Sequence, residues 1–569
     1  MVNLADRSSL LLLICAAVVA STLAGQERRQ VHHTPAPTTH TPSHSDPLAA
    51  WMSSASKSKP NVLFLVADDL RPKLGCYGDT NMVTPNIDNL ASKSVMFRQA
   101  FAQVALCAPS RTSFLTGRRP DTTRVYDLHH YWRRVAGNFT TLPQYFKNHG
   151  YIAQGVGKIF HPGHESSGND DKHYSWNRDN FHGPDAYHSD SERHKAAYRP
   201  VDTTNNKLQD THIADFAVNF LRDHAHNRDQ PFFLAVGFIK PHLPFIFPKE
   251  YLDLYPLSKI HLAAHRTRPT AMPDIAFSNA GEIRSYLDVA ATPTTTSSKI
   301  FPDDFQKTLR RGYSAATSYM DAQLGRVLKA LSQYGYADNT IISFLGDHGW
   351  HLGDNAEWCK HTNFEMALRI PMMLHVPGVT ANNHHFDFID ALTPGFTNNN
   401  DSRVPGPSHV TDELVEAIDL YPTLTELSGL TVPQTCPENS VHVPTCLEGT
   451  SLVPLVKQVR NISKDPHMQW KQAAFSQYER HSGQHPIMGY TVRTKTHRYT
   501  EWVHFDTHKW RGDFSQVMAR ELYQHSSDPY EFHNLAEVTS YSDTANQLSQ
   551  VLRNGWRKTQ QTYLDTLHH

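Results

Sequence analysis

Cysteine is scarce in this chain, and long apolar runs are missing. Six cysteines occur in 569 residues, and a chain of this length can bury a large core that does not depend on disulfides. The apolar run from Leu10 to Ala20 is too short to span a bilayer, and no later run is long enough to do so. The formal net charge is only −1, so the protein lacks the excess of positive charge that would indicate binding to nucleic acid at neutral pH.

The start of the chain has the composition of a targeting segment. The short apolar run follows Arg7 and precedes small residues, which is the pattern of a secretory signal peptide over residues 1–25. Residues 26–59 are rich in His, Thr, Pro and Ser, and we expect them to form a disordered pro-segment because they hold too little apolar surface to fold. Sequons beginning at Asn138, Asn400 and Asn461 suit a secreted glycoprotein.

Histidine is abundant, with 37 residues against a net charge near zero. The protein therefore becomes cationic as the pH falls below about 6. That change would suit a polyanionic substrate met in an acidic compartment. A solvated histidine-rich surface with no role is the alternative.

Buried strands alternate with amphipathic helices over residues 60–455, which predicts an α/β domain with a doubly wound, mostly parallel sheet. After residue 456 the sequence becomes β-rich and ends in a helical pattern, so we expect a smaller C-terminal α+β subdomain over 456–569 with an antiparallel sheet. Residues 256–300 form a long excursion that could shape the rim of a substrate site. The expected strands are 61–67, 231–238, 339–346 and 370–376, and the expected helices are 84–94, 142–149, 210–224, 305–334, 412–430 and 545–567.

The segment from Leu106 to Pro120 organises the candidate site. Pro109 suits the first turn of a short helix and Gly117 suits its end, so Cys107 lies at the positive helix N-terminus. Arg111 adds a fixed positive charge one turn along. An anion bound at residue 107 would be well held. A buried structural cysteine before an ordinary helix is the alternative.

Carboxylates follow two of the expected strands. Asp68 and Asp69 end the strand 61–67, and Asp347 ends the strand 339–346. Ligands of α/β sheets bind beyond the carboxyl ends of the strands, and carboxylate oxygens suit Ca²⁺ or Mg²⁺. Three converging carboxylates would repel one another without a cation, which predicts a metal. Helix-capping aspartates at a strand end are the alternative.

The run C-A-P-S-R-T-S-F-L-T-G-R from Cys107 resembles the signature of the type I sulfatases. The resemblance implies that a formylglycine-generating enzyme oxidises Cys107 to formylglycine, an aldehyde whose hydrate is the nucleophile. It also implies the alkaline-phosphatase-like sulfatase fold. The pattern E-L-Y followed by D-P-x-E-x-x-N-L, from Glu521 and Asp528, resembles the C-terminal region of the family.

The resemblance assigns roles to individual residues. Asp68, Asp69, formylglycine-107, Asp347 and His348 would bind Ca²⁺, although calcium prefers oxygen to the nitrogen of His348. The catalytic set would be Arg111, which orients the aldehyde hydrate, His161, which contacts it, Lys158, which binds sulfate, and His242 and Lys360, which bind sulfate and protonate the leaving oxygen. Near pH 5 an unperturbed histidine is mostly cationic, so we expect His242 to donate that proton.

Within the family, the chain resembles the lysosomal branch that removes 2-O-sulfate from iduronate at the non-reducing end of heparan and dermatan sulfate. The segments V-G-K-I-F-H-P-G, P-F-F-L-A-V-G and D-H-G-W carry this resemblance. Cys436 and Cys446, close together in a Pro-rich segment, are expected to form a local disulfide. The alternatives are a sulfatase of another glycosaminoglycan or of aryl sulfates, an inactive glycan-binding homologue and a phosphohydrolase of the same fold.

Overall fold

The structure of the protein is a computed structural model in which the chain divides into two units, Met1–Ser45 and Asp46–His569. Everything that follows concerns the second unit. The expected signal peptide, most of the expected pro-segment and the sequon at Asn400 lie outside the described residues. Those described are 46–185, 194–278, 280–294, 300–394, 396, 406–462, 468–482 and 485–567.

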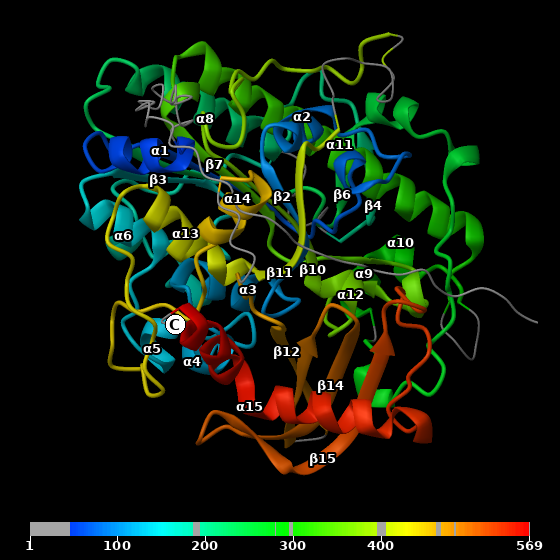
Figure 1. Ribbon diagram of the computed structural model, residues 1–569. Coiled ribbons are helices and arrows are strands. Elements are labelled where there is room, and N and C mark those ends of the chain that lie inside the picture. Colours follow the sequence, from blue (N-terminus) through cyan, green and yellow to red (C-terminus); the bar gives the residue numbers. More distant parts are fainter. Residues whose placement is uncertain are drawn as a thin grey trace, which may run out of the picture. The chain divides into compact units, whose positions relative to one another are not determined.

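A seven-stranded sheet in the order β11-β2-β10-β7-β1-β5-β3 forms the centre of the larger part (Figure 1). All neighbouring pairs are parallel except those of β10, which runs antiparallel to β2 and β7. The expected α/β class with a mostly parallel sheet is therefore confirmed. The strands are β1 (Asn61–Ala67), β2 (Val95–Phe101), β3 (Ile152–Gly157), β5 (Phe232–Phe238), β7 (Thr340–Gly346), β10 (Arg369–His375) and β11 (His409–Glu416).

Helices cover both faces of this sheet. On β1, Leu63 and Leu65 pack in a cluster with residues of α2, α8 and α11, whereas Val62 and Phe64 pack in a cluster with α3, α6 and α13 on the other face. Burial on both faces explains why β1, β5 and β7 read as continuous apolar runs. The helices are α2 (Pro85–Ser92), α3 (Cys107–Thr116), α6 (Leu142–Asn148), α8 (Gln209–His224), α11 (Asp303–Gln333) and α13 (Leu420–Leu427).

Two expectations about local structure are wrong. Residues 412–430 are not one helix, because β11 occupies 409–416 and pairs with β2 before α13 begins at Leu420. The expectation of disorder over residues 26–59 is wrong for its described part: helix α1 (Pro47–Ala55) lies within it, and Asp46 accepts hydrogen bonds from the backbone N–H groups of Leu48 and Ala49. The Trp51 indole donates to the Leu427 carbonyl at 2.9 Å, which anchors α1 to the domain.

The C-terminal part is an antiparallel sheet with the order β12-β13-β14-β15, lined by a long helix (Figure 1). The expected boundary at 455/456 falls inside α14 (Val453–Val459), which packs on α13 and β11. We therefore place the start of this subdomain after α14. Its elements are β12 (Ala474–Ser482), β13 (His485–Arg493), β14 (His497–Asp506), β15 (Arg511–Gln524) and α15 (Ser542–Leu567).

Short elements complete the described chain. Among the described residues, no helix is both long and apolar enough to cross a membrane. The expected disulfide between Cys436 and Cys446 is present. The short helices and strands are α4 (Pro120–Thr123), α5 (Trp132–Val135), α7 (Lys172–Ser175), β4 (Tyr198–Val201), β6 (Phe245–Pro248), α9 (Gly281–Arg284), α10 (Leu287–Ala290), β8 (His351–Leu352), β9 (Trp358–Cys359) and α12 (Glu365–Leu368).

Candidate active site

Helix α3 presents Cys107 in its first turn, as the sequence predicts. Leu106 is the N-cap residue, and Gly117 ends the helix with a left-handed φ of 65°. This backbone conformation favours glycine, and a Cβ at Gly117 would also lie 2.5 Å from Cδ2 of Leu447, which would have to shift. Every residue of α3 is buried. The cysteine is therefore held rigidly at the positive end of a short helix.

The carboxyl ends of β1 and β7 bring the three aspartates together. Ala67 pairs with Gly346 at the ends of these parallel strands, so Asp68 and Asp69 lie beside Asp347. The Asp69 backbone N–H donates to Asp347 Oδ1 at 3.0 Å. All three carboxylates are fully buried. As the sequence predicts, three buried carboxylates therefore lie close together at the carboxyl ends of β1 and β7.

Arg111 links two of the aspartates to the loop that follows β3. Its Nε donates to Asp347 Oδ2 at 2.9 Å, and Nη2 donates to Asp68 Oδ1 at 3.2 Å. Nη1 donates to the backbone carbonyls of Lys158 and Ile159. A buried guanidinium with partners on all sides fixes the geometry of the whole cluster.

Two lysines lie against the Cys107 thiol. Lys158 Nζ is 3.6 Å and Lys360 Nζ is 3.5 Å from Cys107 Sγ. Lys158 also pairs with Asp68 at 2.5 Å, and Lys360 pairs with Asp69 at 2.7 Å. Burial opposes the charged forms, but Asp68 and Asp69 outweigh it and raise the pKa values of Lys158 and Lys360. Both lysines are therefore cationic at any physiological pH.

Lys158 comes from a strand end rather than from a free surface loop. It follows β3, and its backbone N–H donates to the Gly237 carbonyl of β5 at 2.9 Å. A Cβ at Gly157 would lie 2.0 Å from that carbonyl oxygen, and φ of Gly157 is 72°. Only glycine permits this close approach of the two strands.

The thiol itself is a poor nucleophile. Burial, and next the charge of Asp68, raise the pKa of Cys107 well above its usual value. A reactive cysteine needs a lowered pKa. The thiol form of residue 107 is therefore a weak nucleophile.

Positively charged side chains balance the three aspartates. Three cations, those of Arg111, Lys158 and Lys360, already contact the three aspartates. Convergence of carboxylates therefore does not by itself imply a metal, contrary to our expectation.

Other observations do fit a cation. Asp69 Oδ2 is buried without a hydrogen-bond donor among the described residues. His348 donates its Nδ1–H to the Gly349 carbonyl, so its Nε2 lone pair points at oxygens of Asp69 and Asp347, each 3.5 Å away. Burial raises the pKa of Asp347 to about 7. The ligand atoms of Asp68, Cys107, Asp347 and His348 all lie within 4.8 Å of one another.

His242 differs from expectation in its charge. Its Nδ1–H donates to the Leu243 carbonyl at 2.6 Å, and its Nε2 lies 3.8 Å from Asp69 Oδ2. Burial, and next the charge of Lys360, lower the pKa of His242 to about 3. In the free protein the imidazole is neutral near pH 5, so the expectation of a cationic His242 is wrong for this state. Of His242 and Lys360, Lys360 is the hydrogen-bond donor that stays charged at any physiological pH.

His161 lies at the edge of the cluster. Its Nδ1 pairs with the buried Glu165 four residues on. Burial lowers the pKa of His161 below its usual value, and the nearby charge of Lys158 acts in the same direction. The structure thus brings the other nine predicted residues into one connected network and leaves His161 beside it.

Sequence reasoning missed the outer layer of the site. Glu282 of α9 contacts Lys360 and His242, and His361 contacts both Glu282 and the Tyr478 hydroxyl at 2.8 Å. Tyr478 belongs to β12, so the C-terminal subdomain contributes to the mouth of the site. A single carboxylate in a long excursion carries no motif, and only the fold brings it here.

Arg118, the last residue of the signature, and Asp121, just after it, have a structural role. Arg118 donates to carbonyls at Ser440 and Val443 in the disulfide loop. Asp121 accepts hydrogen bonds from Gln477 at 2.7 Å and from Tyr490 at 3.0 Å. The helix that carries Cys107 is thereby fixed to the C-terminal sheet.

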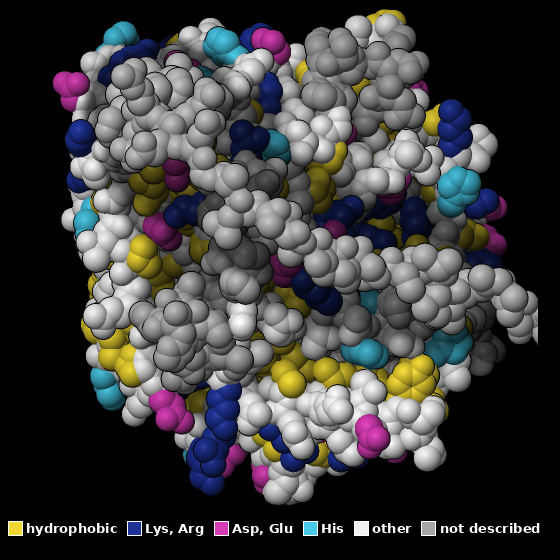
Figure 2. All heavy atoms as spheres, viewed as in Figure 1, with side chains coloured by type: hydrophobic (Ala, Val, Ile, Leu, Met, Phe, Trp, Pro, Cys, Tyr) yellow, Lys and Arg dark blue, Asp and Glu magenta, His cyan; other side chains and the backbone are white. Residues whose placement is uncertain are grey.

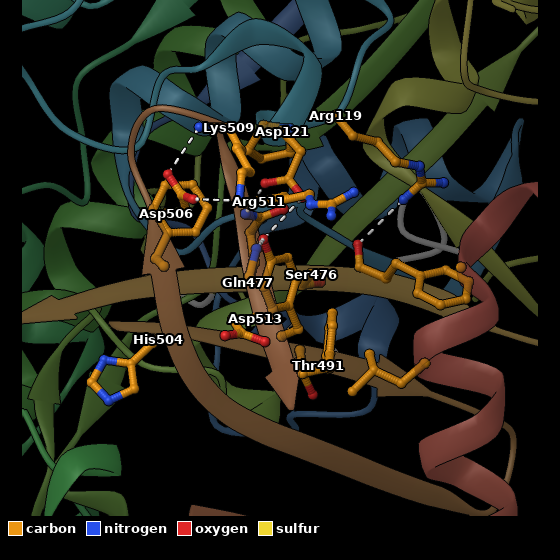
Figure 3. A pocket seen from close by; sticks show the side chains of 18 of the residues that line it. Arg119, Asp121, Ser476, Gln477, Thr491, His504, Asp506, Lys509, Arg511 and Asp513 are labelled. Carbon is orange, nitrogen blue, oxygen red and sulfur yellow. Dashed lines mark hydrogen bonds and ion pairs between the residues drawn. The ribbon is translucent and has the colours of Figure 1, made fainter. Parts of the chain in front are cut away.

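A cavity of about 990 Å³ lies beside these contacts, lined by Arg119, Asp121, Gln477 and residues of β13 to β15 (Figure 3). Gln477 and Tyr478 are successive strand residues, so their side chains point to opposite faces of the sheet. Gln477 faces the cavity, whereas Tyr478 contacts His361. None of the residues that line the cavity belongs to the Cys107 cluster.

Comparison with known proteins agrees with this arrangement. The Sulfatase family profile matches residues 60–430, and a profile described as N-sulphoglucosamine sulphohydrolase, C-terminal, matches residues 401–558. Iduronate 2-sulfatase of Mus musculus is 42% identical over 518 residues, covering 86% of this chain and 92% of that protein. The Homo sapiens iduronate 2-sulfatase is 42% identical over 506 residues, covering 84% and 90%.

A solved structure supports the fold alone. The phosphonate monoester hydrolase of Silicibacter pomeroyi aligns with a TM-score of 0.62 at 20% identity, covering 88% of this chain and 96% of that one.

Proposed function

The chain belongs to the sulfatase family, and we propose that it hydrolyses the 2-O-sulfate of iduronate at the non-reducing end of heparan or dermatan sulfate. The buried thiol of Cys107, enclosed by Lys158, Lys360 and a network of aspartates, is the observation that carries the proposal. As a thiol it is unreactive, and as an aldehyde it would sit where an anionic ester is bound. The 42% identity to iduronate 2-sulfatases supports the choice of sugar.

We infer that Cys107 is converted to formylglycine by a formylglycine-generating enzyme. One hydroxyl of the aldehyde hydrate attacks sulfur, and the bond between sulfur and the sugar oxygen breaks. The second hydroxyl then loses its proton, the carbonyl re-forms, and the bond from residue 107 to sulfate breaks. Water restores the hydrate. A serine could form the sulfate ester but could not expel sulfate in this way, so the aldehyde explains why no water needs to attack a crowded ester.

The surrounding residues take the remaining roles. Arg111 orients the hydrate through its contacts with Asp68 and Asp347. Lys158 and Lys360 neutralise the sulfate oxygens as charge develops. Lys360, cationic throughout, supplies the proton or hydrogen bond to the leaving oxygen, and His242 shares this role once a bound anion favours its charged form. His161, in contact with the hydrate, remains part of the proposed set.

Asp68, Asp69, Asp347, His348 and residue 107 would hold a calcium ion. When bound, the ion would polarise sulfate oxygens and favour the ionised aspartates. The donor-free oxygen of Asp69 and the inward lone pair of His348 fit this assignment.

We place the enzyme in the lysosome, reached through the secretory pathway. The signal-peptide pattern, the disulfide and the abundance of histidine support this location. Histidines are scattered over the face drawn in Figure 2 rather than gathered in one patch. Acidification would therefore raise the positive charge across this face rather than at a single patch, which favours approach of a polyanionic chain.

Release of inorganic sulfate from defined oligosaccharides tests the proposal. The purified protein should desulfate a chain that ends in iduronate 2-sulfate and should leave 6-O- or N-sulfated glucosamine ends intact. Cleavage of only the glucosamine sulfates would refute the iduronate specificity while leaving a sulfatase. Zinc in place of calcium by metal analysis would favour a phosphohydrolase.

A further inference from the structure

Glu282 lies at the mouth of the site and contacts the two groups assigned to the leaving oxygen. It belongs to α9, within the excursion of residues 256–300. Its Oε1 is 3.2 Å from Lys360 Nζ and 3.4 Å from His242 Nε2, and its Oε2 is 3.1 Å from His361 Nε2. One carboxylate thus touches three basic side chains at the mouth of the site.

Glu282 is ionised and reachable from solvent. Burial opposes ionisation, but the charge of Lys360 and a hydrogen bond from His361 hold the pKa of Glu282 well below its usual range. Its side chain is 23% exposed, whereas Asp69, on the other side of Lys360, is fully buried. Each carboxylate oxygen can accept more than one hydrogen bond. Glu282 therefore keeps acceptor capacity toward a molecule that enters the mouth.

The bound ester would lie next to this acceptor. This step rests on the proposed function, in which Lys360 and His242 contact the ester oxygen. An oxygen hydrogen-bonded to Lys360 Nζ lies within about 6 Å of Glu282 Oε1, because those two atoms are 3.2 Å apart and a hydrogen bond spans about 3 Å. Within this distance the sugar can place the hydroxyl of the adjacent ring carbon at hydrogen-bond distance from Glu282.

We propose that Glu282 is a specificity-determining residue that accepts a hydrogen bond from a free hydroxyl beside the sulfate-bearing carbon of the sugar. A hydrogen bond to a charged acceptor is stronger than one between neutral groups, which favours sugars that present the hydroxyl. A second sulfate or another anion at that position would be repelled by the carboxylate. The residue selects the sugar, while Lys158 and Lys360 select the sulfate.

The test compares a saccharide substrate with the same saccharide in which hydrogen replaces the hydroxyl beside the sulfate-bearing carbon. Glu282→Gln keeps the shape of the side chain and removes its charge. We expect kcat/KM for an oligosaccharide ending in iduronate 2-sulfate to fall about 10- to 100-fold more than kcat/KM for the matched oligosaccharide ending in 3-deoxy-iduronate 2-sulfate. The two substrates share the same leaving oxygen, so effects of Glu282 on Lys360 and His242 act on both alike and cancel in this ratio.

Controls separate specificity from general damage. Asp274→Asn removes an exposed carboxylate of the same excursion, which pairs with Arg268, and should leave the ratio unchanged. Glu282→Asp keeps the charge and should restore part of the ratio; it also replaces the Gln variant if that variant fails to fold.

Three results would overturn the proposal. Equal losses of kcat/KM on both substrates would show that Glu282 acts only by positioning Lys360 and His242. No loss of kcat/KM on either substrate would show that Glu282 has no role in the reaction. A wild-type protein that cleaves no sulfate ester would refute the proposed function itself and the role of Glu282 with it.

Discussion

Glu357 gives a sharp test of the buried electrostatics. Its side chain is fully buried, Oε1 accepts the Ser278 backbone N–H at 2.7 Å, and Oε2 has no donor among the described residues. Burial raises the pKa of Glu357 to about 8. The folded protein therefore keeps a proton on Glu357 at pH values where the unfolded chain has lost it.

The sign and size of the effect follow from proton linkage. Between the ordinary glutamate pKa and about 8, the native state binds more protons than the unfolded state, so stability falls as the pH rises. For this one group, the loss between pH 6 and pH 8 is about 2 kcal/mol. Glu357→Gln removes the titration, so its unfolding free energy should fall less than that of the wild type over the same range.

Urea unfolding followed by tryptophan fluorescence at pH 6, 7 and 8 measures this difference. The amide NH₂ of the variant is left without an acceptor where Oε2 was, and this costs about 1–3 kcal/mol at every pH. The change with pH is therefore the informative quantity. Glu250→Gln, at an exposed position, should leave the pH dependence unchanged. Parallel curves for wild type and Glu357→Gln would refute the reasoning.

Three further substitutions test other parts of the structure. Cys107→Ser should abolish turnover without lowering the unfolding midpoint, since serine fits the site but cannot form the aldehyde; retained turnover would contradict this. Asp347→Asn should reduce bound calcium, measured by plasma emission, and cut activity by orders of magnitude, because a charged ligand is lost; unchanged calcium and activity would exclude the assignment. Arg498→Met removes the guanidinium that lies 2.6 Å from both Glu365 and Glu531. Glu365 keeps Arg493 and Glu531 keeps His525 as ion-pair partners, so the protein should lose about 3 kcal/mol of stability in urea unfolding; a loss below 1 kcal/mol would show that the pairs matter little.

The sequence predicts the strands that are buried on both faces and misses those that carry polar residues. The run V-L-F-L-V-A of β1 is unmistakable, whereas Arg98 in β2 and Gln154 in β3 interrupt their apolar patterns. The segment D-E-L-V-E of β11 has good helix formers, but pairing with β2 makes it a strand. Tertiary pairing, which no local pattern records, decides these cases.

The candidate site divides in the same way. Residues in motifs or at strand ends, such as Cys107, Asp68 and Asp347, could be located because their neighbours fix where the backbone must lie. Glu282 could not, since its position depends on how a 45-residue excursion folds back over the sheet edge. The neutral state of His242 was also hidden, because its pKa depends on burial and on a lysine more than a hundred residues away.

The mass of the peptide of residues 99–111 from the active protein tests directly whether Cys107 is converted to formylglycine. Trypsin releases this peptide with Cys107 inside it. We expect a peptide that is lighter than the cysteine form by the exchange of sulfur for oxygen and the loss of two hydrogens. The fraction of this lighter peptide should rise in proportion to specific activity across preparations. Only unmodified thiol at residue 107 in a fully active preparation would contradict the formylglycine mechanism.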